Sequence, residues 1–290
     1  MEKPLVVGVD GSDGSLRAVD WAVEEAARFG LPLRLVYASL WERYEGSYPT
    51  LSADRSVEGV MAENIVATCV ERAGRRNKEV RVSGEVLPED AVSALLRTAH
   101  TSAAVVTGSR GRGEVAGLLL GSVSLAVAAR AVCPVIVVRG AERNRQGSFG
   151  RVVVGVGDSP SAEALSFALH EAQARGCGVL AVRAWRCPAH ENVDSPLMRD
   201  DSAIAHEERA SATLTNALRE VVHDHSEVEV VRQVIEGPAH KALLDVATEA
   251  DLVVVGAVRR HTHVGLQLGR VAHTLLHHAE CPVAVVPQRA

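Results

Sequence analysis

The sequence has no excess of positive charge and no long apolar run. It contains 31 lysine and arginine residues against 36 aspartate and glutamate residues, a formal net charge of −5 at pH 7. A nucleic-acid or anionic-membrane partner needs a basic face, so both are disfavoured. No apolar run approaches the roughly 18 residues of a membrane span, and no charged-then-apolar signal opens the chain. We therefore expect a globular cytoplasmic protein, whose 290 residues allow one large or two ordinary domains.

The sequence also has no pattern of cysteine or histidine typical of a metal site. Its cysteines are odd in number, scattered and without a Cys-x-x-Cys pair: Cys69, Cys133, Cys177, Cys187 and Cys281. This distribution disfavours a disulfide framework and is typical of buried thiols in a reducing compartment. His273 and His277 are four residues apart on an expected helix, but no carboxylate or cysteine completes a tetrahedral ligand set. We therefore expect no metal site, and no serine, histidine and acid carry the local signature of a hydrolase.

The chain repeats itself once. Three segments recur: Val6-Val-Gly-Val-Asp-Gly-Ser as Val153-Val-Gly-Val-Gly-Asp-Ser, Trp21-Ala-Val-Glu-Glu-Ala as Phe167-Ala-Leu-His-Glu-Ala, and Cys133-Pro-Val-Ile-Val-Val as Cys281-Pro-Val-Ala-Val-Val. The late segments keep a constant offset of 148 residues (256 − 108 and 281 − 133). A period this long indicates a duplicated domain. We predict domains at residues 1–140 and 151–290, joined by a polar, glycine-bearing linker at 141–150.

Each half alternates strand-like and helix-like segments. The strands expected in the first half are Leu5–Val9, Leu33–Tyr37, Val80–Val86, Ala103–Thr107 and Pro134–Val138. Ser12 is the expected N-cap of the first helix, and Val19 and Val23 lie on its apolar face. Five strands separated by helices predict parallel crossovers and a doubly wound α/β sheet. Sheets of this class bind ligands beyond the carboxyl ends of their strands, where the strand order reverses.

A glycine-rich loop connects the expected fourth strand to the helix that follows it. Gly108, Gly111 and Gly121, with Ser122, have the spacing G-x2-G-x9-G-[ST], which neither a Walker loop nor a dinucleotide-binding fingerprint has. Glycine lets a backbone approach a ligand closely, and the N-terminus of a helix favours an anion. The alternative is an ordinary flexible loop. If the first and fourth strands are neighbours, Asp10 and Gly108 meet at one crevice, which favours a nucleotide site.

These segments together resemble a known family. Val-Gly-Val-Asp10-Gly-Ser, Trp21-Ala, the glycine spacing from Gly108 to Ser122 and Cys133-Pro-Val look like a universal stress protein, and the duplication resembles the tandem form over nearly the whole chain. The resemblance implies two Rossmann-like (adenine nucleotide alpha-hydrolase-like) domains, each a five-stranded parallel sheet of order 3-2-1-4-5. In the subclass with this glycine spacing it also implies ATP binding, with Mg2+ accompanying the phosphates. It does not imply an established turnover reaction.

The resemblance also implies which residues hold the nucleotide. Asp10 is expected at the ribose and adenosine end, and Ala38 at the adenine through its backbone. The phosphate-binding residues are expected to be Gly108, Ser109, Arg110, Gly111, Arg112, Gly113, Gly121, Ser122, Val123 and Ser124. For the two arginines of this set, the alternative is that they are solvated loop residues.

The second half departs from this pattern. In its loop Gly256 and Gly269 remain, but Arg259 replaces the second glycine and Arg270 replaces the serine. A side chain at 259 should block close approach of the backbone, and Arg270 places a cation at the positive end of a helix. We predict that this half binds ATP weakly or not at all. The alternative is that the arginines themselves bind a phosphate.

The fifth strand of each half is an unbroken apolar run, Val135-Ile-Val-Val and Val283-Ala-Val-Val. An exposed outer strand normally carries charges or breaks. We therefore predict that the two fifth strands pair with each other within the chain. The alternative is burial of both faces beneath helices, which produces the same run. The sequence leaves open whether two chains form a homodimer.

The function predicted from the sequence is that of an ATP-binding stress or regulatory protein with one intact site, in the first half. ATP would act as a ligand that stabilises one conformation. A slow ATPase or phosphoryl-transfer enzyme is the first alternative, although no assured general base or water-positioning group lies near Ser122. A nucleotide-independent interaction scaffold is the second alternative.

Overall fold

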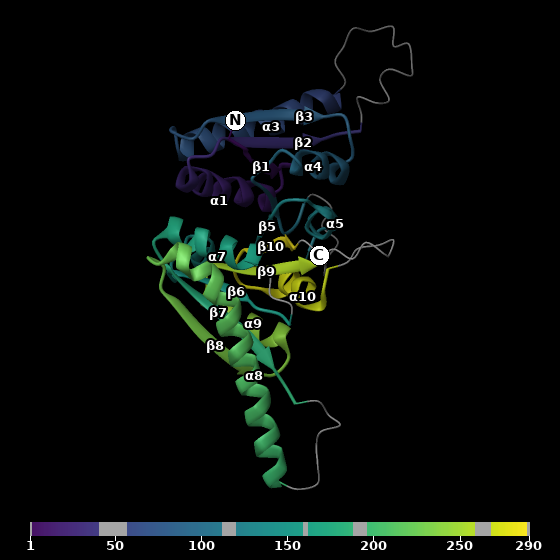
Figure 1. Ribbon diagram of the computed structural model, residues 1–290. Coiled ribbons are helices and arrows are strands. Elements are labelled where there is room, and N and C mark those ends of the chain that lie inside the picture. Colours follow the sequence, from purple (N-terminus) through teal and green to yellow (C-terminus); the bar gives the residue numbers. More distant parts are fainter. Residues whose placement is uncertain are drawn as a thin grey trace. The chain divides into compact units, whose positions relative to one another are not determined.

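The computed structural model describes residues 2–40, 57–111, 120–158, 162–187, 196–258 and 268–288, and in residues 196–201 and 258 only the backbone. The described residues divide into two compact units, one ending at Arg139 and the other beginning at Gly140. We call them unit 1 and unit 2 (Figure 1). Each unit is an α/β fold of parallel strands, so the predicted fold class is confirmed.

Unit 1 is a parallel sheet covered by helices on both faces. Its elements are β1 (Leu5–Gly8), α1 (Asp13–Phe29), β2 (Leu33–Ala38), α3 (Val57–Arg76), β3 (Val82–Leu87), α4 (Ala91–Ala99), β4 (Ala104–Gly108), α5 (Ser122–Arg130) and β5 (Val135–Val138). The strands pair in the order β3-β2-β1-β4-β5. Helix α1 packs against α3, and α4 packs against α5, which makes two helical layers (Figure 1).

Unit 2 repeats this arrangement. Its elements are α6 (Glu142–Arg145), β6 (Arg151–Gly155), α7 (Ala162–Arg175), β7 (Gly178–Trp185), α8 (Pro196–Val222), the 3-10 turn His223–His225, β8 (Val230–Glu236), α9 (Ala239–Ala247), β9 (Leu252–Val258), α10 (Arg270–His278) and β10 (Val283–Gln288). The strands pair in the order β8-β7-β6-β9-β10, again all parallel. The two units therefore share one topology, as their sequence repeat predicts.

The core of each unit is the layer of central strands. In unit 1, Val6 and Val7 of β1 and Val105 and Val106 of β4 are completely buried, because helices cover both faces of these strands. Strand β3 is the outer strand beside β2, and none of its residues is fully buried: Ser83 and Gly84 are exposed and the other four are half-buried. The central strands can thus be continuous apolar runs, and their carboxyl ends carry the polar residues of the candidate site.

Residues 141–150, which the sequence suggests are a linker, begin with helix α6 and contain a fully buried side chain. The amide of Asn144 donates to the carbonyls of Thr248 and Ala250, at 3.1 and 2.8 Å. The carboxylate of Asp251 accepts the backbone N–H groups of Phe149 and Arg151, at 2.9 and 3.1 Å. These contacts fix the segment to the start of β9 and make it part of unit 2.

Pairing between the two fifth strands remains a prediction, and amide exchange can test it. The carbonyl of Pro134 accepts the N–H of Val105 in β4, and that of Val138 accepts the N–H of Ser109, just after β4. The N–H groups of Val135 and Val137 therefore point away from β4. If β5 has a second neighbour, these two amides should exchange about as slowly as those of the central strands. Hydrogen exchange measured by NMR decides the question. Fast exchange at both amides would leave β5 an open edge and contradict the pairing.

Candidate functional site

Three strands of unit 1 end together at the carboxyl edge of its sheet. Asp10 follows β1, Ala38 ends β2 and Gly108 ends β4. Strand β1 pairs with β2 on one side and with β4 on the other, so the strand order reverses between β1 and β4. This is the switch point at which doubly wound sheets bind ligands. The first and fourth strands are therefore neighbours, which is the condition on which the sequence argument for a site near Asp10 and Gly108 depends.

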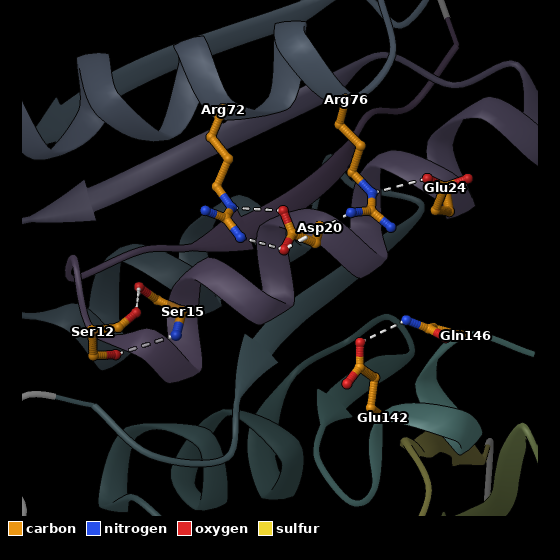
Figure 2. A network of polar contacts seen from close by, with 8 residues as sticks. All are labelled: Ser12, Ser15, Asp20, Glu24, Arg72, Arg76, Glu142 and Gln146. Carbon is orange, nitrogen blue, oxygen red and sulfur yellow. Dashed lines mark hydrogen bonds and ion pairs between the residues drawn. The ribbon is translucent and has the colours of Figure 1, made fainter.

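Ser12 organises the turn between β1 and α1. Its backbone is extended, with φ −75° and ψ 158°, and its Oγ accepts the N–H of Ser15 at 3.2 Å, which confirms the predicted N-cap. The Ser15 hydroxyl donates back to the Ser12 carbonyl at 2.9 Å (Figure 2). The Ser12 hydroxyl also donates to Asp10 Oδ1 at 2.6 Å, and Oδ1 accepts the Ser12 N–H at 3.0 Å. The Asp10 carboxylate is thus held in one orientation at the start of α1.

The turn needs glycine at one position. Gly11 has a φ of +78°, a conformation that side-chain-bearing residues rarely adopt. Because the chain reverses there, Asp10 lies at the edge of the sheet and Ser12 begins the helix.

Gly108 and Gly14 allow the glycine loop to pack on the first turn of α1. A Cβ on Gly108 would lie 2.5 Å from the carbonyl carbon and oxygen of Gly14, and a Cβ on Gly14 would lie 2.1 Å from the carbonyl oxygen of Arg110. From the sequence, Gly108 was expected to allow close approach of a phosphate, and no role was predicted for Gly14. The structure shows that both are required for backbone packing between β4 and α1. The signal for Gly14 was its place in the first helical turn, where glycine is otherwise unfavourable.

Gly111 brings the loop to the carboxylate of Asp10. A Cβ there would lie 2.4 Å from Asp10 Oδ2. Gly121 is less restricted, since a Cβ would meet only ordinary contacts at 3.7 Å or more, the first of them with the Ser109 carbonyl. That carbonyl accepts the Gly121 N–H at 2.8 Å, which closes the loop on itself. Residues 109–111 of the loop therefore lie between Asp10 and the beginning of α5.

The N-terminus of α5 faces this loop. Gly121 is its N-cap and no side chain of the described residues caps it, so the N–H groups of the first turn, Ser122 to Ser124, can bind a ligand. The Ser122 side chain is exposed. Ser124, expected at the phosphates, is buried and its hydroxyl donates to the Gly108 carbonyl at 2.7 Å. Its side chain therefore fixes the loop to the helix, and only its backbone N–H faces the expected site.

The remaining predicted residues are placed as follows. Ser109 is half-buried, and its N–H donates to the Val138 carbonyl at 3.1 Å. Arg110 is exposed. Ala38 is half-buried at the end of β2. The backbone N–H of the next residue, Ser39, donates to the Leu87 carbonyl at 2.9 Å. Arg112 and Gly113 lie outside the described residues.

An apolar pocket of about 480 Å³ opens beside Gly11. Its walls are Leu16 of α1 and one face of α3, and they include Met61, Ile65 and Cys69. Burial raises the pKa of the Cys69 thiol, so the side chain is uncharged at neutral pH. Ala38 does not line this pocket.

Ion pairs between α1 and α3 fix the walls of this pocket. The guanidinium of Arg72 makes two bonds of 2.6 Å to Asp20, and Arg76 binds Glu24 at 2.9 Å (Figure 2). The bidentate pair is the stronger geometry, and Asp20 raises the pKa of Arg72 further. Exposed pairs contribute little stability individually, but these define how α3 lies on α1.

Unit 2 differs at each of these points. Gly155 pairs with Val182 as Gly8 pairs with Val36, so Gly157 stands where unit 1 has Asp10. Arg183 fills this turn, because its guanidinium donates to the Gly157 carbonyl and to Asp158 Oδ1, the latter at 2.7 Å. Arg270 begins α10 and is exposed, and Arg259 lies outside the described residues. At the position of Asp10 unit 2 therefore has a glycine, and the carboxylate of the next residue, Asp158, binds Arg183.

Comparison with known proteins decides the family. The sequence profile of the universal stress protein family matches residues 1–139 and again residues 148–287. The chain belongs to the universal stress protein family. Universal stress proteins of Mycobacterium tuberculosis and Mycobacterium bovis are each 33% identical to it over 303 aligned residues, which cover 99% of this chain and 100% of theirs.

The solved structures agree with the family at the level of the fold. The crystal structure of a universal stress protein from Archaeoglobus fulgidus has a TM-score of 0.68 and 17% identity, and covers 100% of both chains. In the present chain, no helix among the described residues is long and apolar enough to cross a bilayer. In the same residues, no three histidine, cysteine or acidic side chains are gathered as a metal site would require.

Proposed function

We propose that unit 1 binds one ATP molecule per chain, as a ligand that regulates the protein. The observation that supports this most directly is the continuity of the site. The uncapped N-terminus of α5 adjoins the loop at Gly111, and Gly111 adjoins the carboxylate of Asp10. An anion-binding end and a hydrogen-bond acceptor therefore lie along one crevice, as a nucleotide with phosphates and ribose hydroxyls requires.

The phosphates would bind at α5. The N–H groups of Ser122, Val123 and Ser124 and the Ser122 hydroxyl are the donors there, and the helix dipole favours negative charge. Exposed Arg110 can add a charge-assisted bond from the loop. Among the described residues of this crevice, Asp10 is the carboxylate that could bind Mg2+. Because one carboxylate cannot fill an octahedral coordination shell, most of the Mg2+ ligands would be phosphate oxygens and water.

The nucleoside would bind on the other side of Asp10. A carboxylate offers about four acceptor positions, and the bonds from Ser12 to Oδ1 hold this one in a fixed orientation in which it can accept bonds from ribose hydroxyls. The apolar pocket beside Gly11, at about 480 Å³, lies within the range of roughly 300–1,000 Å³ that small-molecule sites occupy. We assign the adenine ring to this pocket, walled by α1 and α3. Backbone contact from Ala38 is then secondary.

ATP acts in this proposal by differential affinity. A ligand shifts a conformational equilibrium only as far as it binds one state better than the other. The loop from Gly108 to Ser122 joins β4 to α5 and contacts α1, so ATP bound there would tie these three elements together. The cytoplasm, where ATP is abundant, is the compartment that this function requires.

Titration calorimetry with ATP tests the proposal. Wild-type protein should bind one ATP per chain, and Asp10→Asn should weaken binding about tenfold or more, because a charged acceptor for the ribose is lost. Asp13→Asn is the matched control, since Asp13 is an exposed acid three residues further on, and it should change the affinity less than about twofold. Two equivalent ATP sites per chain, or equal effects of the two variants, would contradict the proposal.

A further inference from the structure

A second cavity lies in unit 2 and has a different chemistry. It has a volume of about 560 Å³ and opens at the ends of β7 and β8, against α8 and the first residues of α9 and α10. Four arginines line it: Arg183, Arg186, Arg209 and Arg270. The acidic side chain in the lining is Asp158. Among the described residues that line the cavity, four guanidinium groups stand against one carboxylate, which makes this lining strongly positive in a chain whose net charge is −5.

The arginines come from separate elements and converge on one space. Arg183 belongs to β7 and Arg186 follows it, whereas Arg209 lies in the middle of α8 and Arg270 begins α10. Like charges repel when they are gathered. Convergence from three elements and a loop therefore indicates a site for an opposite charge rather than one solvated face of a helix.

Arg183 is held rigidly at the base of this group. Its side chain is 12% exposed, and its guanidinium donates to the carbonyls of Val156 and Gly157 and to Asp158. Its Nε–H is buried and has no hydrogen-bond partner among the described residues. A buried donor without a partner is costly. Asp158 is fully exposed, so it only partly offsets the charge of Arg183.

Two helix N-termini add to the positive potential. The N-cap of α9 is Pro238 and that of α10 is Gly269, and no side chain of the described residues caps either helix. Pro238 and Ala239 at the start of α9, and Arg270 at the start of α10, line the cavity. The partial positive charges of both helices therefore face the same space as the arginines.

Two of these arginines have no basic counterpart in unit 1. Strand register places Tyr37 of unit 1 where unit 2 has Arg183, and Ser122 begins α5 as Arg270 begins α10. The change from Ser122 to Arg270 reads, in the sequence alone, as the loss of a phosphate site. In the structure, Arg270 is one of four arginines whose side chains line the same cavity.

We propose that this cavity is a second anion site, which binds a small ligand carrying a diphosphate or triphosphate group through arginine side chains. Guanidinium groups bind phosphate oxygens in pairs, and four of them match a ligand with several adjacent anionic oxygens better than a single anion. The diphosphate is free or part of a nucleotide, and the recognising chemistry is the same. This site goes beyond the proposed function of unit 1, because none of its residues belongs to unit 1.

Calorimetry with inorganic pyrophosphate on the full-length protein tests this site. Pyrophosphate binding is measured in two separate experiments, one with saturating ATP and one with saturating adenosine. Each is compared with the binding of orthophosphate under the same conditions. With adenosine present, pyrophosphate should bind at least about tenfold more tightly than orthophosphate, because several arginines engage it at once. If ATP prevents this binding, the site accepts nucleotides; if ATP leaves it intact, the ligand is the free anion.

The variants assign the binding to unit 2. Arg209→Ser and Arg186→Ser should each weaken pyrophosphate binding about tenfold. Both side chains are exposed, so the melting temperature should stay unchanged. Arg219→Ser is the matched control, since Arg219 is exposed on the same helix α8 and does not line the cavity. Absence of pyrophosphate binding at millimolar concentration, or binding that both variants leave intact, would overturn the proposal. A failure of ATP to bind unit 1 would not affect this result.

Discussion

Gly108→Ala is expected to lower the free energy of unfolding of unit 1 by about 2–3 kcal/mol, at the upper end of overpacking costs, and to abolish ATP binding. The added Cβ would lie 2.5 Å from the carbonyl carbon and oxygen of Gly14 and 3.0 Å from the Ser15 nitrogen. All three are backbone atoms in the first turn of α1. They cannot rotate away, so β4 and α1 must separate, and the loop between Asp10 and α5 moves with them.

The repeat provides the control for this prediction. Gly256 occupies the equivalent position in unit 2, 148 residues later (256 − 108). A Cβ there would meet the side-chain amide of Gln288, with its nearest atom at 1.8 Å. That side chain ends a flexible stem and can rotate, so Gly256→Ala should cost less than about 1 kcal/mol. The same substitution at equivalent positions of two homologous units should thus have clearly different effects.

Urea unfolding followed by tryptophan fluorescence and circular dichroism measures both variants, and calorimetry measures their ATP binding. Equal destabilisation by the two substitutions would show that the contact with Gly14 does not decide the effect. Normal ATP binding by a folded Gly108→Ala protein would contradict the role assigned to the loop geometry.

Asp251→Ala is expected to destabilise unit 2 by about 3 kcal/mol. The Asp251 side chain is 4% exposed, and its two oxygens accept the N–H groups of Phe149 and Arg151 at 2.9 and 3.1 Å. Removing the carboxylate leaves two donors without an acceptor, and each costs about 1–3 kcal/mol when it stays away from water. The start of β6 then loses this side-chain link to the start of β9, although the backbone bond from the Asp251 N–H to the Arg151 carbonyl, at 2.9 Å, remains.

Glu249→Ala is the control for this second prediction, because Glu249 is an exposed acid two residues earlier. It should change the free energy of unfolding by less than about 0.5 kcal/mol. Thermal and urea unfolding of the full chain give both values. A change below about 1 kcal/mol for Asp251→Ala would mean that water replaces the carboxylate, and would contradict a structural role for residues 141–150.

The fold was predictable because its signals are local or repeated. The apolar runs at Val6 and Val105 define central strands by themselves, and Ser12 supplies the oxygen that an N-cap needs. The loop spacing from Gly108 to Ser122 predicted where the candidate site should lie. Asn144 was not foreseen as a buried residue, since its partners are carbonyls about a hundred residues away in the chain.

By itself, the sequence determined the class of fold, its duplication and the loop in which a nucleotide site should lie. Periodicity, capping and repeated spacing depend on neighbours along the chain, and these can be read directly from it. Only the tertiary structure decided why Gly108 must be glycine and that Arg183, Arg209 and Arg270 line one cavity. Both facts depend on close approach between segments that are distant in the sequence, and local patterns carry no information on such distances.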